Sequence, residues 1–85
     1  MLFRSIMEIA FVLVKCKTAH EMDVMREILK IDGVKEAHGT FGMYDIFVKV
    51  VGANHKAVSD IITKQIRQTK NVVSTTTLST IPEQG

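Results

Sequence analysis

Two segments of the chain, residues 8–15 and 44–51, are rich in β-branched and aromatic residues. In the first, "EIAFVLVK", Ile9 and Phe11 point to one side of an extended strand and Ala10 points to the other. The second, "YDIFVKVV", places apolar side chains on both sides in the same way. A strand that is apolar on both faces is stable only when both faces are covered. The chain is therefore expected to form a sheet that is buried on two sides.

The segments that follow these strands carry helical spacing and helix-end signals. Thr18 stands three residues before Glu21, the spacing of a capping box, and Gly33 suits the left-handed residue that ends a helix. Asn54 is the expected cap of a second helix, and Asn71 is its expected left-handed exit. The core-facing stripes predicted for the two helices are Met22, Met25, Ile28 and Leu29, and then Val58, Ile61, Ile62 and Ile66.

The predicted element order is β-α-β-β-α-β, because further strands over residues 34–41 and 72–81 follow the two helices. The order is also a repeat, since "EIAFVLVK…GVKEA" and "DIFVKVV…NVVST" are two β-α-β halves of similar length. This is the ferredoxin-like α+β plan, a four-stranded antiparallel sheet with two helices on one face. One domain is predicted over residues 8–81, with an N-terminal extension at 1–7 and a C-terminal tail at 82–85.

This plan leaves the second face of the sheet without helices, although that face is also apolar. With 46% hydrophobic residues in 85, the chain would expose a larger apolar patch than monomers usually tolerate. Each aliphatic side chain that is covered stabilises the assembly by about 1.5–3 kcal/mol. We therefore expect an obligate homodimer that forms by packing of the sheets, as in a dimeric α+β barrel.

Charge and composition exclude several function classes. The formal charge of +2 is small and mixed in sign, which argues against nucleic-acid binding. The single cysteine, Cys16, has no intrachain disulfide partner and suits a reducing cytoplasm. Glu8 interrupts the apolar N-terminal stretch, so neither a targeting signal nor a membrane span is expected. No local metal-ligand or nucleophile spacing occurs, so neither a cofactor nor an enzymatic activity is predicted.

The turn "GTFGMYD", residues 39–45, is the first candidate for a binding site. Its glycines allow backbone N–H groups to point outward and form a cup for a carboxylate. Asp45 has the charge to hold an ammonium group, and Tyr44 offers an apolar wall with a polar tip. Together these groups match the two charges of a free amino acid. An ordinary hairpin, in which Asp45 bonds to turn amides, explains the same residues and is favoured by composition alone.

The run "TTT" in the last strand is the second candidate. Alternation along a strand places Thr75 and Thr77 on one face and Thr76 on the other. Hydroxyl groups on an edge strand are suited to bonding a ligand or a neighbouring subunit. Plain β-propensity also explains a threonine run in a strand.

The turn-strand "GMYDIFVKV", the β-α-β-β-α-β order and the closing "STTTLSTI" together resemble the C-terminal effector domain of the Lrp/AsnC transcription regulators, also called the RAM domain. The resemblance covers residues 8–81 and includes no N-terminal helix-turn-helix, so a stand-alone domain without direct DNA binding is expected. It implies dimers that form through their sheets and join into tetramers or octameric rings. It also implies that an amino-acid effector binds between dimers, near the Gly-x-Tyr-Asp turn.

Carried over to this chain, the resemblance implies that Gly42 and Tyr44 line the cup, with Met43 between them, and that Asp45 takes the amine. Phe41 stands where the family often has threonine, and this side chain is expected to reshape the pocket. The implied function is non-enzymatic sensing of a small molecule, with co-assembly with full-length Lrp/AsnC regulators as its output. The last strand is expected to contribute Thr75, Thr76 and Thr77, and which of these hydroxyls faces the site stays open.

Two alternatives remain beside this interpretation. A small dimeric α+β barrel enzyme, such as a monooxygenase or an isomerase, would use His38, Tyr44 and Asp45, although no matched acid–base pair is visible. A structural adaptor without a ligand is the other alternative. It predicts that the change Asp45→Ala leaves both assembly and partner binding unchanged.

Overall fold

The computed structural model describes residues 7–78 and 81–82. Residues 1–6 of the expected N-terminal extension and residues 83–85 of the expected tail lie outside the described residues. The elements follow the predicted order, with one short strand added at the end. They are β1 (Glu8–Cys16), α1 (Glu21–Leu29), β2 (Val34–Gly39), β3 (Ile46–Gly52), α2 (His55–Asp60), its π-helical continuation η1 (Ile61–Ile66), β4 (Val72–Thr77) and β5 (Ile81–Pro82).

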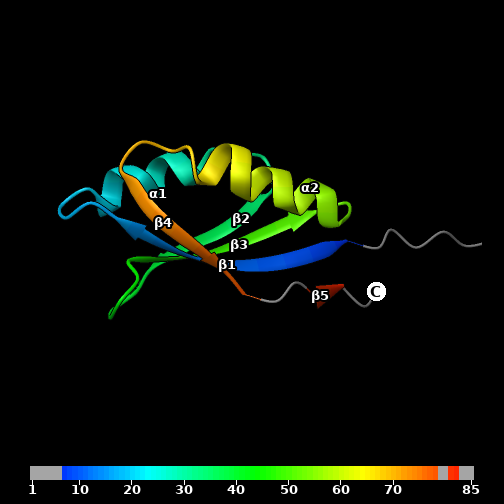
Figure 1. Ribbon diagram of the computed structural model, residues 1–85, viewed down its shortest axis with the longest axis horizontal. Helices are drawn as coiled ribbons and strands as arrows, with labels where there is room; N and C mark the ends of the chain where they lie inside the picture. The colour runs from blue at the N-terminus through cyan, green and yellow to red at the C-terminus, as the bar shows by residue number, and fades with distance from the viewer. Residues whose placement is uncertain (1–6, 79–80, 83–85) are drawn as a thin grey trace, which may run out of the picture.

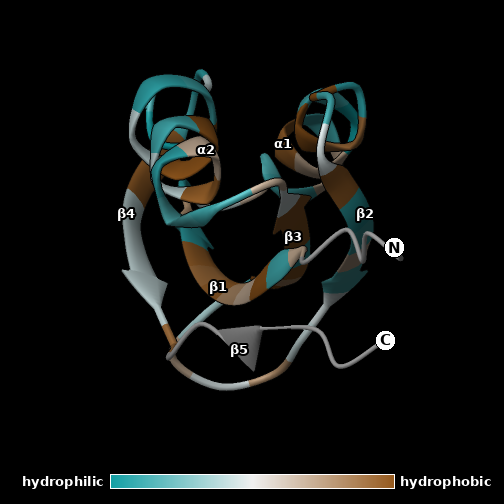
Figure 2. Cartoon of the chain, turned by 90° about the vertical axis from the view of Figure 1, so that its right-hand side faces the viewer, coloured by the Kyte–Doolittle hydropathy of each residue, from teal (hydrophilic) through white to brown (hydrophobic). Residues whose placement is uncertain are grey.

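The sheet is antiparallel throughout and has the strand order β2-β3-β1-β4. The central strand β1 pairs with β3 from Glu8, opposite Gly52, to Val14, opposite Ile46. On its other edge, the C-terminal half of β1 pairs with β4, and its first two residues pair with β5. Both helices lie on one face of the sheet (Figures 1 and 2). The predicted ferredoxin-like α+β fold is therefore confirmed.

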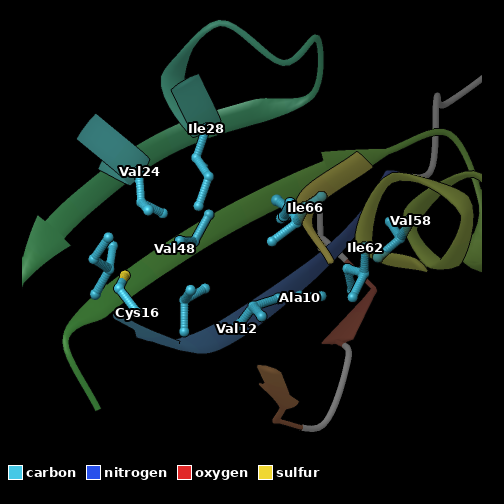
Figure 3. Packing of buried hydrophobic residues seen from close by; sticks show 12 residues of the cluster. Ala10, Val12, Cys16, Val24, Ile28, Val48, Val58, Ile62 and Ile66 are labelled. Carbon is cyan, nitrogen blue, oxygen red and sulfur yellow. The ribbon is translucent and has the colours of Figure 1, made fainter. Parts of the chain in front are cut away.

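A layer of aliphatic side chains fills the space between the helices and the sheet (Figure 3). Strand alternation directs every second residue of β1 and β3 toward the helices, and Val12 lies opposite Val48 at the centre. Burial of each such side chain is worth about 1.5–3 kcal/mol. The buried core consists of Ala10, Val12, Val14, Cys16, Val24, Ile28, Ile46, Val48, Val50, Val58, Ile62 and Ile66.

The opposite face of the sheet, called the open face below, carries no helix (Figure 2). Phe11 and Phe47 stack there across the β1–β3 ladder, with their ring centroids 5.3 Å apart and their planes at 21°. Such stacked pairs add roughly 0.5–1.5 kcal/mol beyond the area they bury. The two strong strands are thus apolar on both sides, as predicted. The half-buried apolar side chains of the open face are Ile9, Phe11, Leu13, Phe47 and Val51.

The second helix forms as its sequence signals predict. The Asn54 side chain accepts a hydrogen bond of 2.8 Å from the Ala57 N–H, and this capping bond fixes the helix start. The continuation η1 is a π-helix, in which the Arg67 N–H donates to the Ile62 carbonyl five residues earlier. Asn71 has the expected left-handed φ of 71° at the exit. The predicted stripe faces the sheet, with Val58, Ile62 and Ile66 buried and Ile61 partly buried.

The predicted start and stripe of the first helix are wrong in part. The helix begins at Glu21 with His20 as its cap residue, and no side chain caps it. The reason is a turn in which Ala19 has a φ of 71° and the His20 N–H bonds to the Lys17 carbonyl, so Thr18 lies outside the helix. The core-facing stripe is centred on Val24 and Ile28, with Met25 packed against it, whereas Met22 and Leu29 are exposed.

The single last strand predicted over residues 72–81 is also wrong in part, because β4 and β5 are separate strands and Leu78 belongs to neither, while residues 79–80 lie outside the described residues. β4 ends at Thr77, and β5 resumes at Ile81 opposite Ile9 of β1. Pro82, expected in the tail, belongs to β5 and lies opposite Glu8. β1 has nine residues, so one six-residue neighbour cannot cover its whole edge. Among the described residues, no helix is long and apolar enough to cross a membrane.

Candidate functional site

The turn that connects β2 to β3 is a closed hairpin, residues 40–45. The Thr40 N–H donates to the Asp45 carbonyl over 2.9 Å, and the Thr40 hydroxyl donates to the Tyr44 carbonyl over 2.7 Å. β3 begins only at Ile46, so Tyr44 and Asp45 belong to the hairpin and not to the predicted strand. The hairpin extends beyond the sheet, and Figure 1 shows it in green at the lower left.

The tip of this hairpin is exposed. Gly42 has a φ of 108°, a left-handed conformation that other residues rarely adopt. Phe41 and Met43 flank it, and both side chains are exposed in the single chain. Phe41 is exposed in one subunit, so its expected effect on a pocket between dimers stays a prediction. Two exposed apolar side chains on a projecting turn suit contact with another molecule.

Asp45 joins the start of β3 to the end of β1. Its N–H donates to the Val14 carbonyl over 2.9 Å, and its carboxylate Oδ2 accepts a hydrogen bond of 2.8 Å from the Cys16 N–H. The β1–β3 ladder ends at the pair of Val14 and Ile46, so no strand carbonyl is paired with the Cys16 N–H. The carboxylate takes that place, and its second oxygen has no hydrogen bond among the described residues.

Cys16 is affected by this arrangement. Burial, and after it the negative charges of Asp45 and Glu21, together raise the pKa of its thiol to about 11. The thiol is therefore protonated at neutral pH and lies in the core. It acts as a small apolar side chain of the core.

The Tyr44 hydroxyl lies 2.8 Å from the Thr76 hydroxyl oxygen. In the strand order, β1 separates β3 from β4, so the Tyr44 side chain reaches across β1 to make this bond. Thr76 lies opposite Leu13 of β1, whose side chain is on the open face. Tyr44 and Thr76 therefore meet on the open face, at the end of the sheet next to the hairpin.

The other two threonines point to the opposite side. Thr75 and Thr77 lie opposite Val14 and Val12, whose side chains face the helices. Arg67 Nε donates to the Thr75 hydroxyl over 3.4 Å. The structure therefore brings Thr76, but neither Thr75 nor Thr77, to the hairpin. Thr77 borders a cavity of about 240 Å³ whose other lining residues are His55, Val58, Ser59, Ile62, Thr63 and Arg67.

Lys15 is a residue of this region that the sequence interpretation missed. Its ammonium group donates a hydrogen bond of 3.2 Å to the Met43 carbonyl and so contacts the hairpin backbone. A signal was present, because Lys15 is the charged residue that interrupts the apolar alternation at the end of the first strong strand. Its side chain shares the open face with Leu13, since residues two apart in a strand point the same way.

His38, which the enzyme alternative would use together with Tyr44 and Asp45, forms its side-chain hydrogen bond with neither of them. His38 lies on β2, where its Nε2 is 3.0 Å from a carboxylate oxygen of Glu36, and both side chains are exposed. This hydrogen bond lowers the pKa of the Glu36 carboxyl group. Within the described part of the chain, no group of three or more metal-ligating side chains lies close together.

A larger groove of about 830 Å³ lies elsewhere, between α1 and the end of η1. Its α1 wall carries charges that are paired within the helix, such as Asp23 with Arg26 and Glu27 with Lys30. Its other wall carries the amides of Gln65 and Gln68 and the ammonium group of Lys70. No hairpin residue borders this groove.

Comparison with known proteins bears on this arrangement. The family model for the Lrp/AsnC ligand binding domain matches the sequence over residues 9–83. A curated relative, an uncharacterized HTH-type transcriptional regulator of Pyrococcus furiosus, is 38% identical over 58 residues. That alignment covers 68% of this chain and 39% of the relative, so the chain spans about two fifths of the relative's length.

Solved structures share the fold. The crystal structure of a hypothetical protein from Pyrococcus horikoshii aligns with a TM-score of 0.80 and 32% identity, covering 87% of this chain and 88% of that one. The structure of E. coli AsnC aligns with a TM-score of 0.77 and 28% identity, covering 84% of this chain and 48% of that one. The fold described above is thus similar to known structures over most of its length.

Proposed function

Since the chain belongs to the family of Lrp/AsnC ligand-binding domains, we propose that it is a non-enzymatic effector module of the kind found in transcription regulators. Its ligand is an amino acid, and its site is the hairpin together with the neighbouring end of the sheet. The site residues are Gly42, Met43, Tyr44, Asp45 and Thr76. Thr75 and Thr77, which face the helices, fall outside this narrower proposal.

The observation that carries the proposal is the bond between Tyr44 and Thr76. It holds an aromatic wall and two hydroxyl groups in place beside the hairpin, before any ligand arrives. Asp45 is fixed there by the Cys16 N–H through one oxygen, so its other oxygen is free to accept an ammonium group. Polar groups that converge on a partly apolar surface are typical of small-molecule sites.

L-Methionine is the first ligand to test. A transcriptional regulator of Neisseria meningitidis and the feast or famine regulatory protein of M. tuberculosis were both solved as complexes with L-methionine. They are 17% and 23% identical to this chain, so what they share with it is the fold. The ligand panel therefore includes all twenty L-amino acids.

The proposed output is a change of assembly. A second copy covers the open face to give a homodimer, and dimers join through the exposed hairpins into tetramers or octamers. Full-length Lrp/AsnC regulators enter the same assemblies as partners. An amino acid bound at the hairpin changes this equilibrium only if it prefers one assembly state.

The test is thermal unfolding of the purified protein with each of the twenty L-amino acids at millimolar concentration. An amino acid at a hundred times its Kd adds about 2.7 kcal/mol to the free energy of unfolding. For a domain of this size that corresponds to a rise in Tm of about 10–20 °C. We expect such a rise with one or a few amino acids, and a flat panel would contradict the proposal.

Three variants locate the site. Tyr44→Phe removes the hydroxyl that bonds to Thr76, and Asp45→Asn removes the charge while it keeps an acceptor for the Cys16 N–H. Both are expected to reduce the rise in Tm. Thr77→Val removes a hydroxyl from the same strand on the helix side and is the matched control. A shift that is equal in Tyr44→Phe and the unchanged protein would place the site elsewhere.

A further inference from the structure

Lys15 occupies the last open-face position of β1. Moving back along the strand, the same face carries Leu13, Phe11 and Ile9, so the apolar row ends in one ammonium group. That group lies next to the hairpin, where it donates to the Met43 carbonyl over 3.2 Å. The Lys15 side chain is exposed, and a bond to one carbonyl uses one of its three N–H donors.

The Lys15 ammonium group forms no ion pair with the described residues, because none of their carboxylates lies within ion-pair distance of it. Eight ion pairs occur elsewhere among the described residues. Asp45, the acid of the hairpin, directs one oxygen to the Cys16 N–H. The hairpin therefore presents a cation from β1 that lacks an anionic partner among the described residues.

Hydroxyl groups lie on the same face around this cation. Lys15 is opposite Ser74 of β4, and Thr76 is opposite Leu13, so Lys15 and Thr76 are diagonal neighbours across the β1–β4 ladder. Diagonal neighbours are about 7–8 Å apart, a separation that a small ligand bridges. Tyr44 brings its hydroxyl to Thr76 from the other side of β1. An ammonium group with hydroxyl donors nearby has the chemistry that binds a carboxylate.

We propose that Lys15 binds the carboxylate of the amino-acid ligand, with the Thr76 and Tyr44 hydroxyls beside it. The inference rests on the proposed function and deepens it. Asp45 supplies a carboxylate and Lys15 an ammonium group beside the same hairpin, one for each charge of a zwitterion. The site therefore selects ligands with a free carboxylate and discriminates against their amides.

The experiment compares ligands with and without the carboxylate, in protein with and without the lysine. Isothermal titration calorimetry measures the Kd of each amino acid that raises the Tm, and of its α-amide. The variants are Lys15→Met, which keeps the length of the side chain, and Lys15→Arg, which keeps the charge. Lys17→Met is the matched control, since Lys17 is exposed and lies two residues further along.

We expect Lys15→Met to weaken the binding of the amino acid about ten- to a hundred-fold, the range for a hydrogen bond to a charged group. The amide, which binds weakly to the unchanged protein, is expected to lose little more. Lys15→Arg restores most of the affinity, and Lys17→Met has no effect.

Three outcomes would overturn the inference. If Lys15→Met binds the amino acid normally while Tyr44→Phe does not, the proposed function stands and the role of Lys15 is refuted. If Lys15→Met weakens the acid and the amide equally, Lys15 only holds the hairpin through the Met43 carbonyl. If no amino acid binds to the unchanged protein, the proposed function and this inference fall together.

Discussion

Asp45 bonds to the end of β1 just beyond Val14 and Ile46, the last residue pair of the β1–β3 ladder. Its backbone N–H bonds to Val14 and its carboxylate accepts the Cys16 N–H, so a single residue completes the end of the β1–β3 pair. A charged acceptor of this kind contributes roughly 1.5–3 kcal/mol. The hydrogen bond from the Cys16 N–H thus explains why an acid precedes the apolar strand β3. Its role toward an amine is a further proposal, and Asp45→Asn separates the two.

Because of the Cys16 thiol, the free energy of unfolding is expected to depend on pH in the alkaline range. Its pKa is raised from the ordinary 9.0 to about 11 in the folded protein. Between these values the unfolded chain releases the proton and the folded chain retains it. The contribution is therefore complete below pH 9 and is lost as the pH rises toward 11. We expect the free energy of unfolding to decrease over this window.

Urea denaturation at a series of pH values from 7.5 to about 11 measures this dependence. Cys16→Ala is the comparison, because lysine side chains also titrate in this range and contribute equally to both proteins. The unchanged protein should lose stability more steeply than the variant above pH 9. Parallel curves would show that the thiol is not perturbed.

A two-residue turn separates the end of β3 at Gly52 from the start of α2 at His55, and Gly52 permits the close approach of these elements. A Cβ atom at Gly52 would lie 2.9 Å from Val58 Cγ2 and 3.1 Å from the Val58 backbone nitrogen. The nitrogen belongs to the helix and does not yield easily. Gly52→Ala is therefore expected to lower the free energy of unfolding by about 1–3 kcal/mol, measured by urea denaturation.

Gly39→Ala is the matched control for that change. Gly39 lies on β2, and its added Cβ would meet only Met25 Cε, at an ordinary 3.8 Å. The substitution is expected to be neutral or to stabilise the protein by up to about 1 kcal/mol, because alanine restricts the unfolded chain. Equal losses in both variants would mean that the close approach at Gly52 is unimportant.

The sequence allowed most elements to be predicted, and the failures have local physical reasons. The strands β1 and β3 are strongly patterned, and Asn54 has the side chain that caps α2, so these elements follow from their residues. The start of the first helix was predicted wrongly because Ala19 adopts a left-handed conformation, which an alanine in the sequence does not indicate. β5 depends on the unpaired edge of β1, which is a tertiary feature.

The site was predictable only in part. Local chemistry pointed to the Gly-x-Tyr-Asp turn and to the run Thr75–Thr77 as candidates, and alternation placed Thr76 on the face opposite to Thr75 and Thr77, without indicating which face meets the turn. The bond between Tyr44 and Thr76 required the strand order, since it joins residues 32 positions apart. Lys15 was missed for the same reason, because its contact with Met43 depends on how the hairpin folds back toward β1.

In the whole molecule, the apolar open face is the surface through which we propose that copies associate. Phe11 and Phe47 stack at its centre without a helix above them. Phe47→Lys places a charge there, and we expect it to convert a dimer into a monomer. Met22→Lys is the control, because Met22 is exposed on α1 on the opposite side of the sheet.

Light scattering coupled to size-exclusion chromatography, at micromolar concentration, gives the mass of each protein. The account predicts a dimer or a larger assembly for the unchanged protein and for Met22→Lys. A monomeric unchanged protein would show that the open face is tolerated without a partner. A dimeric Phe47→Lys would mean that another surface forms the contact.

Mapping by NMR shows where on the protein an amino acid binds. Backbone amide signals of the ¹⁵N-labelled protein are followed while each of the twenty L-amino acids is added. If the amino acid binds at the hairpin, the largest shifts are expected at residues 41–45, Lys15–Cys16 and Ser74–Thr76. Shifts confined to the groove between α1 and η1, or no shifts with any amino acid, would contradict binding at the hairpin.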